Sequence, residues 1–233
     1  ELAVTTHQKK KAILSLSGGM DSSTMLGEMK VRSDYLDVLG AYMFTYGSKH
    51  NRHEIKAASE VAGWYNVPFR VIDLTVAFAG FRSDLMASGG ALPHGHYEAE
   101  SMRKTVVPGR NTIFASVLAG LAESVGADEV WLGIHAGDHH IYPDCRPEWL
   151  TAMNHTVMLS SESKVRLTTP FLHKTKKDIV YIGSRIRVPY DLTRTCYSED
   201  EVACGKCGSC VERREAFMLN GLVDPIQYQY TGP

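Results

Sequence analysis

Apolar and polar positions along the chain change period in a regular way, and the changes predict strands and helices in alternation. Residues 11–17 (KAILSLS) form a short apolar run that ends in two glycines, which is typical of a buried strand leading into a turn. Residues 21–31 then carry apolar side chains at helical spacing, with Asp21 or Ser22 suited to cap the helix. The same succession predicts strands over residues 37–46, 69–72 and 129–133 and helices over residues 53–65, 111–125 and 147–158.

The alternation predicts an α/β fold: a Rossmann-like, doubly wound and mostly parallel sheet with helices on both faces. Ligands of such sheets bind beyond the carboxyl ends of the strands. Residues 17–22, 46–50 and 135–144 all follow predicted strands, so we expect them to meet in one site. Residues 78–105 are Gly-rich and aperiodic, and we expect an active-site loop that orders on ligand binding.

Composition narrows the class of ligand. The 233 residues are 44% hydrophobic and 22% charged, as in ordinary globular proteins, and 25 basic residues balance 26 acidic ones. A chain without a broad basic field favours a small-molecule substrate over direct binding of nucleic acid or of a membrane. The apolar runs are too short to span a bilayer, and residues 1–11 lack the apolar core of a signal peptide, so we expect a cytoplasmic protein.

The sequence SGGMDS at residues 17–22 is typical of a phosphate-binding loop. Two glycines allow a tight turn between a strand and a helix, so that backbone N–H groups face an anion at the positive end of the helix. The loop is neither a Walker A motif nor a dinucleotide GxGxxG motif. Asp21 is suited to hold the Mg²⁺ that accompanies a nucleotide, and the alternative is an ordinary Gly-Gly turn. The nucleotide-binding candidates are Leu16, Ser17, Gly18, Gly19, Met20, Asp21, Ser22 and Ser23.

Four of the five cysteines lie close together near the C-terminus, at Cys196, Cys204, Cys207 and Cys210. Four thiolates with two-residue spacers between the last three are enough for a closed tetrahedral zinc site. An iron–sulfur cluster is the alternative, although no Cys-Pro pair follows Cys210 at ferredoxin spacing. We therefore predict two parts, a nucleotide-binding and catalytic domain over residues 1–193 and a zinc-binding element over residues 194–233.

Several motifs together carry a family resemblance. SGGMDS resembles the loop of the PP-loop ATP pyrophosphatases. Residues 107–111 (VPGRN), residues 142–148 (YPDCRPE) and the cysteine segment together resemble the QueC family. Weaker support comes from Tyr46-Gly47 with His50 and from Thr169-Pro170 with Lys176.

The resemblance implies an adenine nucleotide α-hydrolase type of fold that uses ATP and Mg²⁺, with Zn²⁺ on the cysteines. The implied reaction converts 7-carboxy-7-deazaguanine and ammonia into 7-cyano-7-deazaguanine by adenylation, amidation and dehydration. We also expect a homodimer. The alternatives are a related amidating synthetase that stops at the amide, a sulfur-transferring tRNA enzyme, and a zinc-knuckle nucleic-acid module on an inactive nucleotide-binding domain.

The resemblance also implies roles for residues outside the loop. Arg110 and Asn111, at a predicted helix start, are expected to bind phosphate or a carboxylate. Tyr142, Asp144 and Arg146 are expected to bind the substrate, with Tyr142 stacked on the base and Asp144 accepting hydrogen bonds from its guanine-like edge. Asp21, Ser22 and Lys176 are the catalytic candidates, and Lys176 is expected to neutralise phosphate charge. The ordinary alternatives are a helix cap, a Pro-Asp turn and a solvated lysine.

The chain departs from the family pattern at two places. His139-His140-Ile141 replaces the usual Ser-Gly pair before the YPDC stretch, and His135 lies nearby. Three histidines suggest a second metal site, but lining of a pocket or capping of a helix is the simpler interpretation. After Tyr46-Gly47 the chain has Ser48 where Gln is usual and is one residue longer before Glu54, so the base pocket is expected to differ in detail.

Overall fold

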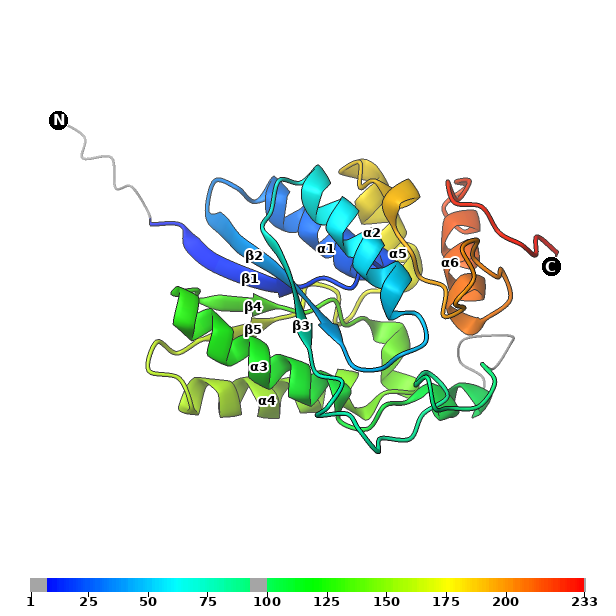
Figure 1. Cartoon of the computed structure of the whole chain (residues 1–233). Coiled ribbons are helices and arrows are strands. Elements are labelled where there is room, and N and C mark those ends of the chain that lie inside the picture. The colour runs from blue at the N-terminus through cyan, green and yellow to red at the C-terminus, as the bar shows by residue number, and fades with distance from the viewer. Residues whose placement is uncertain (1–7, 93–99, 233) are drawn as a thin grey trace.

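The computed structural model describes residues 8–92 and 100–232. Its centre is a five-stranded sheet in the order β3-β2-β1-β4-β5, in which every neighbouring pair is parallel (Figure 1). This is the order of a doubly wound sheet, so the predicted fold class is confirmed. The strands are β1 (Lys10–Ser15), β2 (Leu36–Thr45), β3 (Phe69–Asp73), β4 (Glu129–Trp131) and β5 (Arg166–Thr168).

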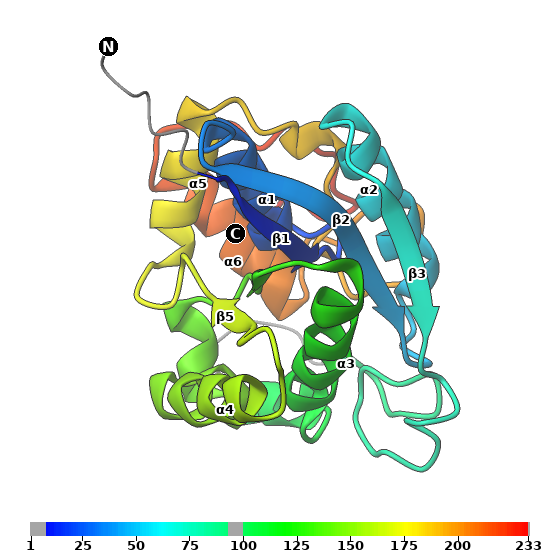
Figure 2. The same cartoon turned by 90° about the vertical axis from the view of Figure 1, so that its left-hand side faces the viewer.

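Helices cover both faces of the sheet. Figures 1 and 2 show α1, α2 and α5 on one face and α3 and α4 on the other. The sequence of strand β1 is apolar because the strand is buried on both faces. Ala12 and Leu14 belong to the core under α1 and α2, whereas Ile13 belongs to the core under α3 and α4. The helices are α1 (Met20–Val31), α2 (Asn51–Trp64), α3 (Arg110–Val125), α4 (Pro147–Leu159), α5 (Lys176–Arg185) and α6 (Gly208–Met218).

Among the strands and α-helices of the described residues, β5, α5 and α6 were given no range from the sequence. Strand β5 is three residues long, so it carries too little pattern to be recognised. The expected cap of α1 was wrong: the helix starts at Met20, with Gly19 in the cap position and no side-chain cap, so that Asp21 and Ser22 lie inside its first turn. None of the described helices is long and apolar enough to cross a membrane.

The described part of the expected active-site loop, residues 78–92 and 100–105, has an apolar core of its own. Phe78 and Leu85 are fully or almost fully buried, and they cluster with Tyr46 and Val107. Residues 93–99 of the expected loop lie outside the described residues, so ordering on ligand binding stays a prediction.

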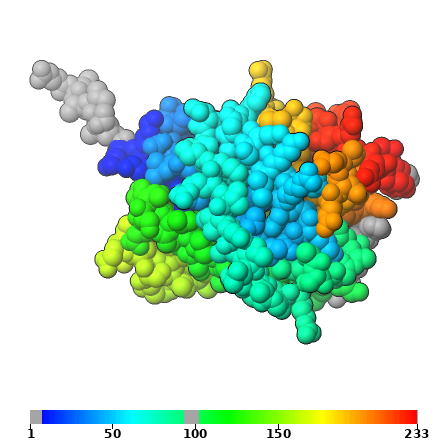
Figure 3. All heavy atoms as spheres, viewed as in Figure 1, coloured from blue at the N-terminus to red at the C-terminus, as the bar shows by residue number. Residues whose placement is uncertain are grey.

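The C-terminal segment is fixed to the domain by a buried arginine. In Figure 3 the orange and red atoms of this segment cover one end of the molecule. Arg213, on α6, is 0% exposed and donates two hydrogen bonds to the Asp224 carboxylate, at 2.8 and 2.9 Å. The same guanidinium donates to Thr193 Oγ1 and to the Tyr190 carbonyl. One side chain therefore joins α6, the segment before the cysteines and the chain after the helix.

Replacing Arg213 by Ala should lower the free energy of unfolding by roughly 3–5 kcal/mol, because it leaves the Asp224 carboxylate buried without its cation. Chemical denaturation can measure the loss. Arg185→Ala, which removes an exposed arginine on α5, is the matched control and should cost less than about 0.5 kcal/mol. Equal stability of the two variants would contradict the anchoring role of Arg213.

Candidate active site

A cavity of about 230 Å³ lies where the carboxyl ends of β1, β2 and β4 meet the C-terminal segment. The loop after β1, the starts of α2, α3 and α5, and the segment after β4 supply most of its walls. The segment after residue 193 closes it with Arg194, Thr195, Tyr197, Ser209 and Glu212. The cysteine-bearing segment is therefore part of the wall of the cavity and not a separate appendage.

The phosphate loop is held by packing against α2. Gly18 has a φ of +75°, and a Cβ atom built on it would lie 2.4 Å from the Ala58 backbone nitrogen. The Ser17 N–H donates to Ser22 Oγ at 3.2 Å, so the loop closes on itself across the turn. Sterics and φ together leave glycine as the residue that fits position 18. Gly19, Asp21 and Ser22 at the start of α1 line the cavity, which puts the positive end of this helix beside it, as is expected of an anion site.

The structure brings most of the predicted nucleotide-binding residues to the cavity, but not all of them. Gly18, Met20 and Ser23 do not line it. Met20 is fully buried in the core next to α5 and α6, and Ser23 is fully buried one turn into α1. The loop residues that line the cavity are Leu16, Ser17, Gly19, Asp21 and Ser22.

A group of charged side chains lies beside the loop. Lys176 Nζ lies 2.6 Å from Asp21 Oδ2 and 3.2 Å from Glu212 Oε2. His135 Nε2 lies 4.0 Å from Asp21 Oδ2 and 3.4 Å from Asp138 Oδ1. The lysine side chain is 8% exposed, so the alternative of a solvated lysine is wrong.

The charged side chains in this group shift one another's pKa. Burial opposes the charged form of Asp21, but the neighbouring Lys176 and His135 outweigh it and lower the pKa of the carboxyl below its usual value. Burial likewise opposes the Lys176 ammonium, and the two carboxylates raise its pKa above the usual range. Burial raises the pKa of Glu212 against the opposing effect of Lys176. At neutral pH, Lys176 is therefore a fixed cation and Asp21 a fixed anion.

His135 has the capping role that was one of the simpler expectations for the histidines. Its Nδ1 accepts a hydrogen bond from the Gly137 N–H at 3.1 Å, at the start of the short 3-10 helix Ala136–His140, and the ring lines the cavity. Within residues 8–92 and 100–232, the one group of histidines, cysteines and carboxylates arranged to hold a metal ion is the cysteine cluster.

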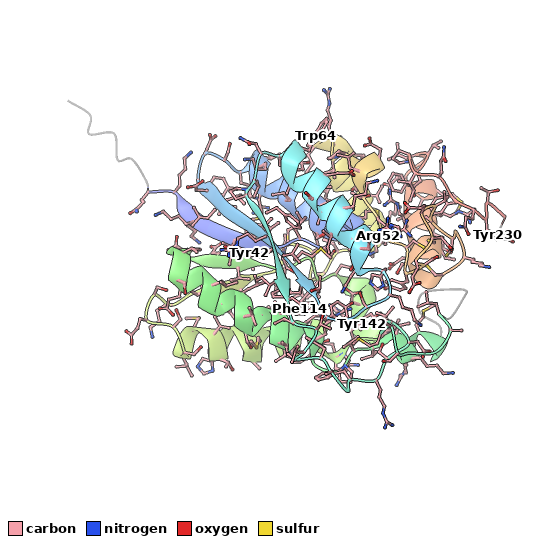
Figure 4. The ribbon with its side chains drawn as sticks, viewed as in Figure 1. Tyr42, Arg52, Trp64, Phe114, Tyr142 and Tyr230 are labelled. Carbon is pink, nitrogen blue, oxygen red and sulfur yellow. The ribbon has the colours of Figure 1, made fainter. Side chains whose placement is uncertain are left out.

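Arg110 and Asn111 begin α3 and line the other end of the cavity. Arg110 Nη1 donates to the Tyr46 hydroxyl at 3.1 Å, and the guanidinium lies 5.7 Å from the centre of the Tyr46 ring and 6.0 Å from that of Tyr142. Phe114 and Tyr142, both labelled in Figure 4, also line this part of the wall. The predicted pair Arg110–Asn111 and the predicted Tyr142 are thus brought together.

Asp144 and Arg146 are not brought to the cavity. Asp144 Oδ2 accepts the Asn111 N–H at 2.8 Å, so the carboxylate satisfies a free donor at the start of α3. Arg146 Nε donates to the His139 carbonyl at 2.9 Å. One polar atom of each side chain is thus directed to the protein's own backbone, and binding of a substrate by Asp144 and Arg146 stays a prediction.

Cys145 is a small buried residue and not a poised nucleophile. It is 3% exposed, and burial raises the pKa of its thiol well above the usual value. The Asn111 side-chain amide donates to its sulfur at 3.0 Å. The simpler of the two interpretations of this cysteine agrees with the structure.

Sequence reasoning missed several residues of the cavity wall, among them Glu54, Arg194, Tyr197 and Glu212. Arg194 connects the phosphate loop with the C-terminal segment. Its backbone N–H donates to the Gly18 carbonyl at 2.9 Å, and its guanidinium donates to three carbonyls of residues 198–201. The one available signal was the spacing of His50 and Glu54, four residues apart and thus on one helix face. The others reach the cavity through contacts between distant segments.

The four predicted cysteine ligands are together. One ligand atom from each of Cys196, Cys204, Cys207 and Cys210 lies within 4.8 Å of the others, and all four residues are buried. Three backbone N–H groups donate to the sulfurs at 3.3 Å, two of them to Cys196 Sγ. Four converging sulfurs with N–H donors around them can hold one metal ion.

A doubly wound sheet with a glycine loop after its first strand and charged side chains around that loop defines a nucleotide-binding α/β protein of the PP-loop type. The structure is similar to the U34-tRNA thiolase NcsA of Methanococcus maripaludis, with a TM-score of 0.52 and 14% identity over 99% of this chain and 79% of that one. It is also similar to the NMN synthetase of Francisella tularensis, with a TM-score of 0.50 and 14% identity over 92% of this chain and 79% of that one. These likenesses show the fold alone.

Sequence comparison identifies the family. The family described as queuosine biosynthesis protein QueC matches residues 11–221. The 7-cyano-7-deazaguanine synthase of Psychromonas ingrahamii is 44% identical over 225 residues, which are 95% of this chain and 99% of that protein. The protein of the same name from a Marinomonas species is 40% identical over 94% of this chain and 99% of its own length. The chain therefore belongs to the QueC family, as its motifs indicated.

The packing of the loop on α2 gives a prediction for two neighbouring glycines. Gly18→Ala should lower the free energy of unfolding by about 2–4 kcal/mol, because the residue has a left-handed φ and its new Cβ would collide with α2. Gly19→Ala is the matched control, since the nearest atom to its Cβ would be Ser17 Oγ at 3.3 Å. Thermal unfolding of both variants measures the difference, and a Gly19→Ala variant less stable than Gly18→Ala would contradict the described packing.

Proposed function

We propose that this chain uses ATP to convert 7-carboxy-7-deazaguanine and ammonia into 7-cyano-7-deazaguanine, a step of queuosine biosynthesis. The observation that carries the proposal is membership of the QueC family over residues 11–221, together with relatives that are named 7-cyano-7-deazaguanine synthase and match over almost their whole length. The cavity supports it, since the glycine loop after β1 and several aromatic side chains line its wall.

A carboxylate is a poor electrophile, and reaction with ATP bound at the phosphate loop activates it. The substrate carboxylate attacks the α-phosphorus of ATP, pyrophosphate leaves, and an acyl adenylate forms. Ammonia then attacks the acyl carbon, AMP leaves with the carboxylate oxygen, and an amide results. In a second round the amide oxygen attacks the α-phosphorus of another ATP and pyrophosphate leaves; loss of AMP with the former amide oxygen, and of both protons on nitrogen, then gives the nitrile. One cavity serves both rounds, because the amide differs from the acid by a few atoms.

The charged group at the loop is placed to handle the phosphates. Backbone N–H groups at the start of α1 and the Ser17 and Ser22 hydroxyls donate to the pyrophosphate portion. Lys176 neutralises charge that develops on the leaving oxygens. Arg110, at the start of α3, binds the phosphate or carboxylate near the reacting carbon, and Tyr142 stacks on the base. We also assign Asp144 the task of holding the start of α3, through the Asn111 N–H.

Asp21 fits the Mg²⁺ that accompanies ATP. Its Oδ1 is buried and has no hydrogen-bond partner among the described residues, so one oxygen of this ionised carboxylate is available to a cation. When bound, Mg²⁺ would neutralise charge on the pyrophosphate portion. Asp21 itself holds a fixed negative charge next to Lys176.

The cysteine cluster fits Zn²⁺ with a structural role. Its four sulfurs leave no open position for a substrate, as is typical of structural zinc sites. When bound, the metal would fix the segment that supplies Arg194, Tyr197 and Glu212 to the cavity wall. We keep residues 1–193 and 194–233 as the two parts of the chain, with the active site formed by both, and we propose a cytoplasmic homodimer whose ligands are small molecules.

Incubation with ATP, ammonium and 7-carboxy-7-deazaguanine should yield the amide and then the nitrile, with AMP and pyrophosphate released. Mass spectrometry and nucleotide chromatography can follow the products. Asp21→Asn should lower turnover by roughly 100-fold or more, because the site loses a charge next to the phosphates. Asp34→Asn, at an exposed position, should retain wild-type turnover. ADP and phosphate as the only nucleotide products, or a reaction that stops at the amide, would contradict the proposed function.

The purified protein should contain about one zinc per chain and be colourless. Cys207→Ser should release the metal and lower the melting temperature markedly, since binding of a structural metal is coupled to folding. Elemental analysis and thermal unfolding measure both effects. A brown protein that contains iron and acid-labile sulfide would overturn the zinc assignment.

A further inference from the structure

The Glu54 carboxyl group has no lysine or arginine within ion-pair distance among the described residues. Asp21 and Glu212 share Lys176, and Asp138 contacts His135. Glu54 likewise contacts a histidine, since His50 Nε2 lies 3.5 Å from Glu54 Oε1. The four carboxyl side chains that line the cavity are Asp21, Glu54, Asp138 and Glu212.

His50 does not supply the missing positive charge. It is 2% exposed, and burial together with the nearby Arg110 and Arg194 lowers its pKa to about 3, so the ring is neutral at neutral pH. Its Nδ1 is buried and has no hydrogen-bond partner among the described residues. The ring lies against Tyr197, with 5.3 Å between the ring centres. A neutral imidazole offers one lone pair and one N–H, so the pair contains a hydrogen-bond acceptor besides the carboxyl.

The surroundings of Glu54 make it an unusually strong base for a carboxylate. Burial raises its pKa to about 8, although Arg110 from α3 and Arg194 from the C-terminal segment oppose the shift. Tyr46, at the end of β2, also faces this group, and its hydroxyl accepts a hydrogen bond from Arg110. With a pKa of about 8 this carboxyl group is protonated in most molecules at neutral pH, and the ionised minority is the form that can bind a cation and take its proton.

The proposed reaction needs such a site. At neutral pH most ammonia is present as ammonium, and ammonium has no lone pair with which to attack an acyl carbon. An ordinary carboxylate is too weak a base to remove that proton to a useful extent, whereas proton transfer becomes efficient when donor and acceptor are closely matched. Glu54 and the aromatic side chains lie on the wall of the same cavity as the phosphate loop.

We propose that Glu54, positioned by His50, binds ammonium and takes one of its protons before the nitrogen attacks the acyl adenylate. The Glu54 carboxylate becomes a carboxylic acid, and the nitrogen gains the lone pair that forms the C–N bond. AMP leaves with the electron pair of the C–O bond, the amide nitrogen loses a further proton to solvent, and Glu54 returns its own proton to solvent before the next turnover. The assignment rests on the proposed function.

The test separates activation of the acid from attack by nitrogen. Glu54→Gln should retain substrate-dependent exchange of pyrophosphate into ATP, because adenylation needs no ammonia. Formation of the amide from ammonium should fall by roughly 100-fold. Hydroxylamine, which is uncharged near neutral pH, should form the hydroxamate with Glu54→Gln within about threefold of the wild-type rate. Glu60→Gln, an exposed glutamate on the same helix, is the matched control and should behave like the wild type in all three assays.

The dependence of amide formation on pH provides a second test. At a fixed concentration of ammonium, amide formation by the wild type should rise with pH and level off above about 8, as Glu54 becomes fully ionised, whereas Glu54→Gln should keep rising with the concentration of free ammonia. A flat wild-type profile would overturn the proposal. So would a variant that loses pyrophosphate exchange or binding of the carboxylate substrate, since Glu54 would then act on the base. If the wild type itself shows no exchange, the proposed function fails first.

Discussion

The arrangement of the active site depends on one buried cation. Lys176 lies between two carboxylates that come from opposite ends of the sequence, Asp21 on α1 and Glu212 on α6. Two anions that contact the same lysine repel each other. The Lys176 side chain is 8% exposed, so water screens the charges around it only slightly. The lysine is therefore the group that makes it possible for the phosphate loop and the C-terminal segment to share one wall.

Charge within the cavity is divided between two regions. Beside the loop, one cation, Lys176, faces the carboxyl groups of Asp21 and Glu212, so this region carries no excess of positive charge before any nucleotide binds. Around the start of α3, Arg110 faces tyrosines, and Glu54 faces a neutral histidine. Phosphates and a carboxylate substrate bring negative charge to the arginine, whereas a small cation is suited to the glutamate. The division gives each reactant of an ATP-dependent amidation a place of its own.

The fold could be predicted from the sequence because the period of apolar residues changes along the chain and the loop interrupts it at a defined point. The loop and the four cysteines were also recognisable, since in both cases the chemistry lies within a few neighbouring residues. Asp144 shows the limit: a motif places the residue near the site, but the direction of the side chain depends on the free N–H of Asn111. Glu212 and Arg194 could not be found, because their positions follow from contacts across the whole chain.

The contribution of α6 to the cavity has a consequence for biosynthesis. A ribosome releases the chain from its N-terminus, so the sheet and the phosphate loop emerge long before Glu212 does. Until that residue arrives, Lys176 faces Asp21 alone, and the cavity lacks the wall that residues 194–212 supply. A chain that lacks residues 194–212 has the phosphate loop without the wall that closes the cavity. Closure of the cavity therefore depends on a segment that the ribosome makes after all five strands of the sheet.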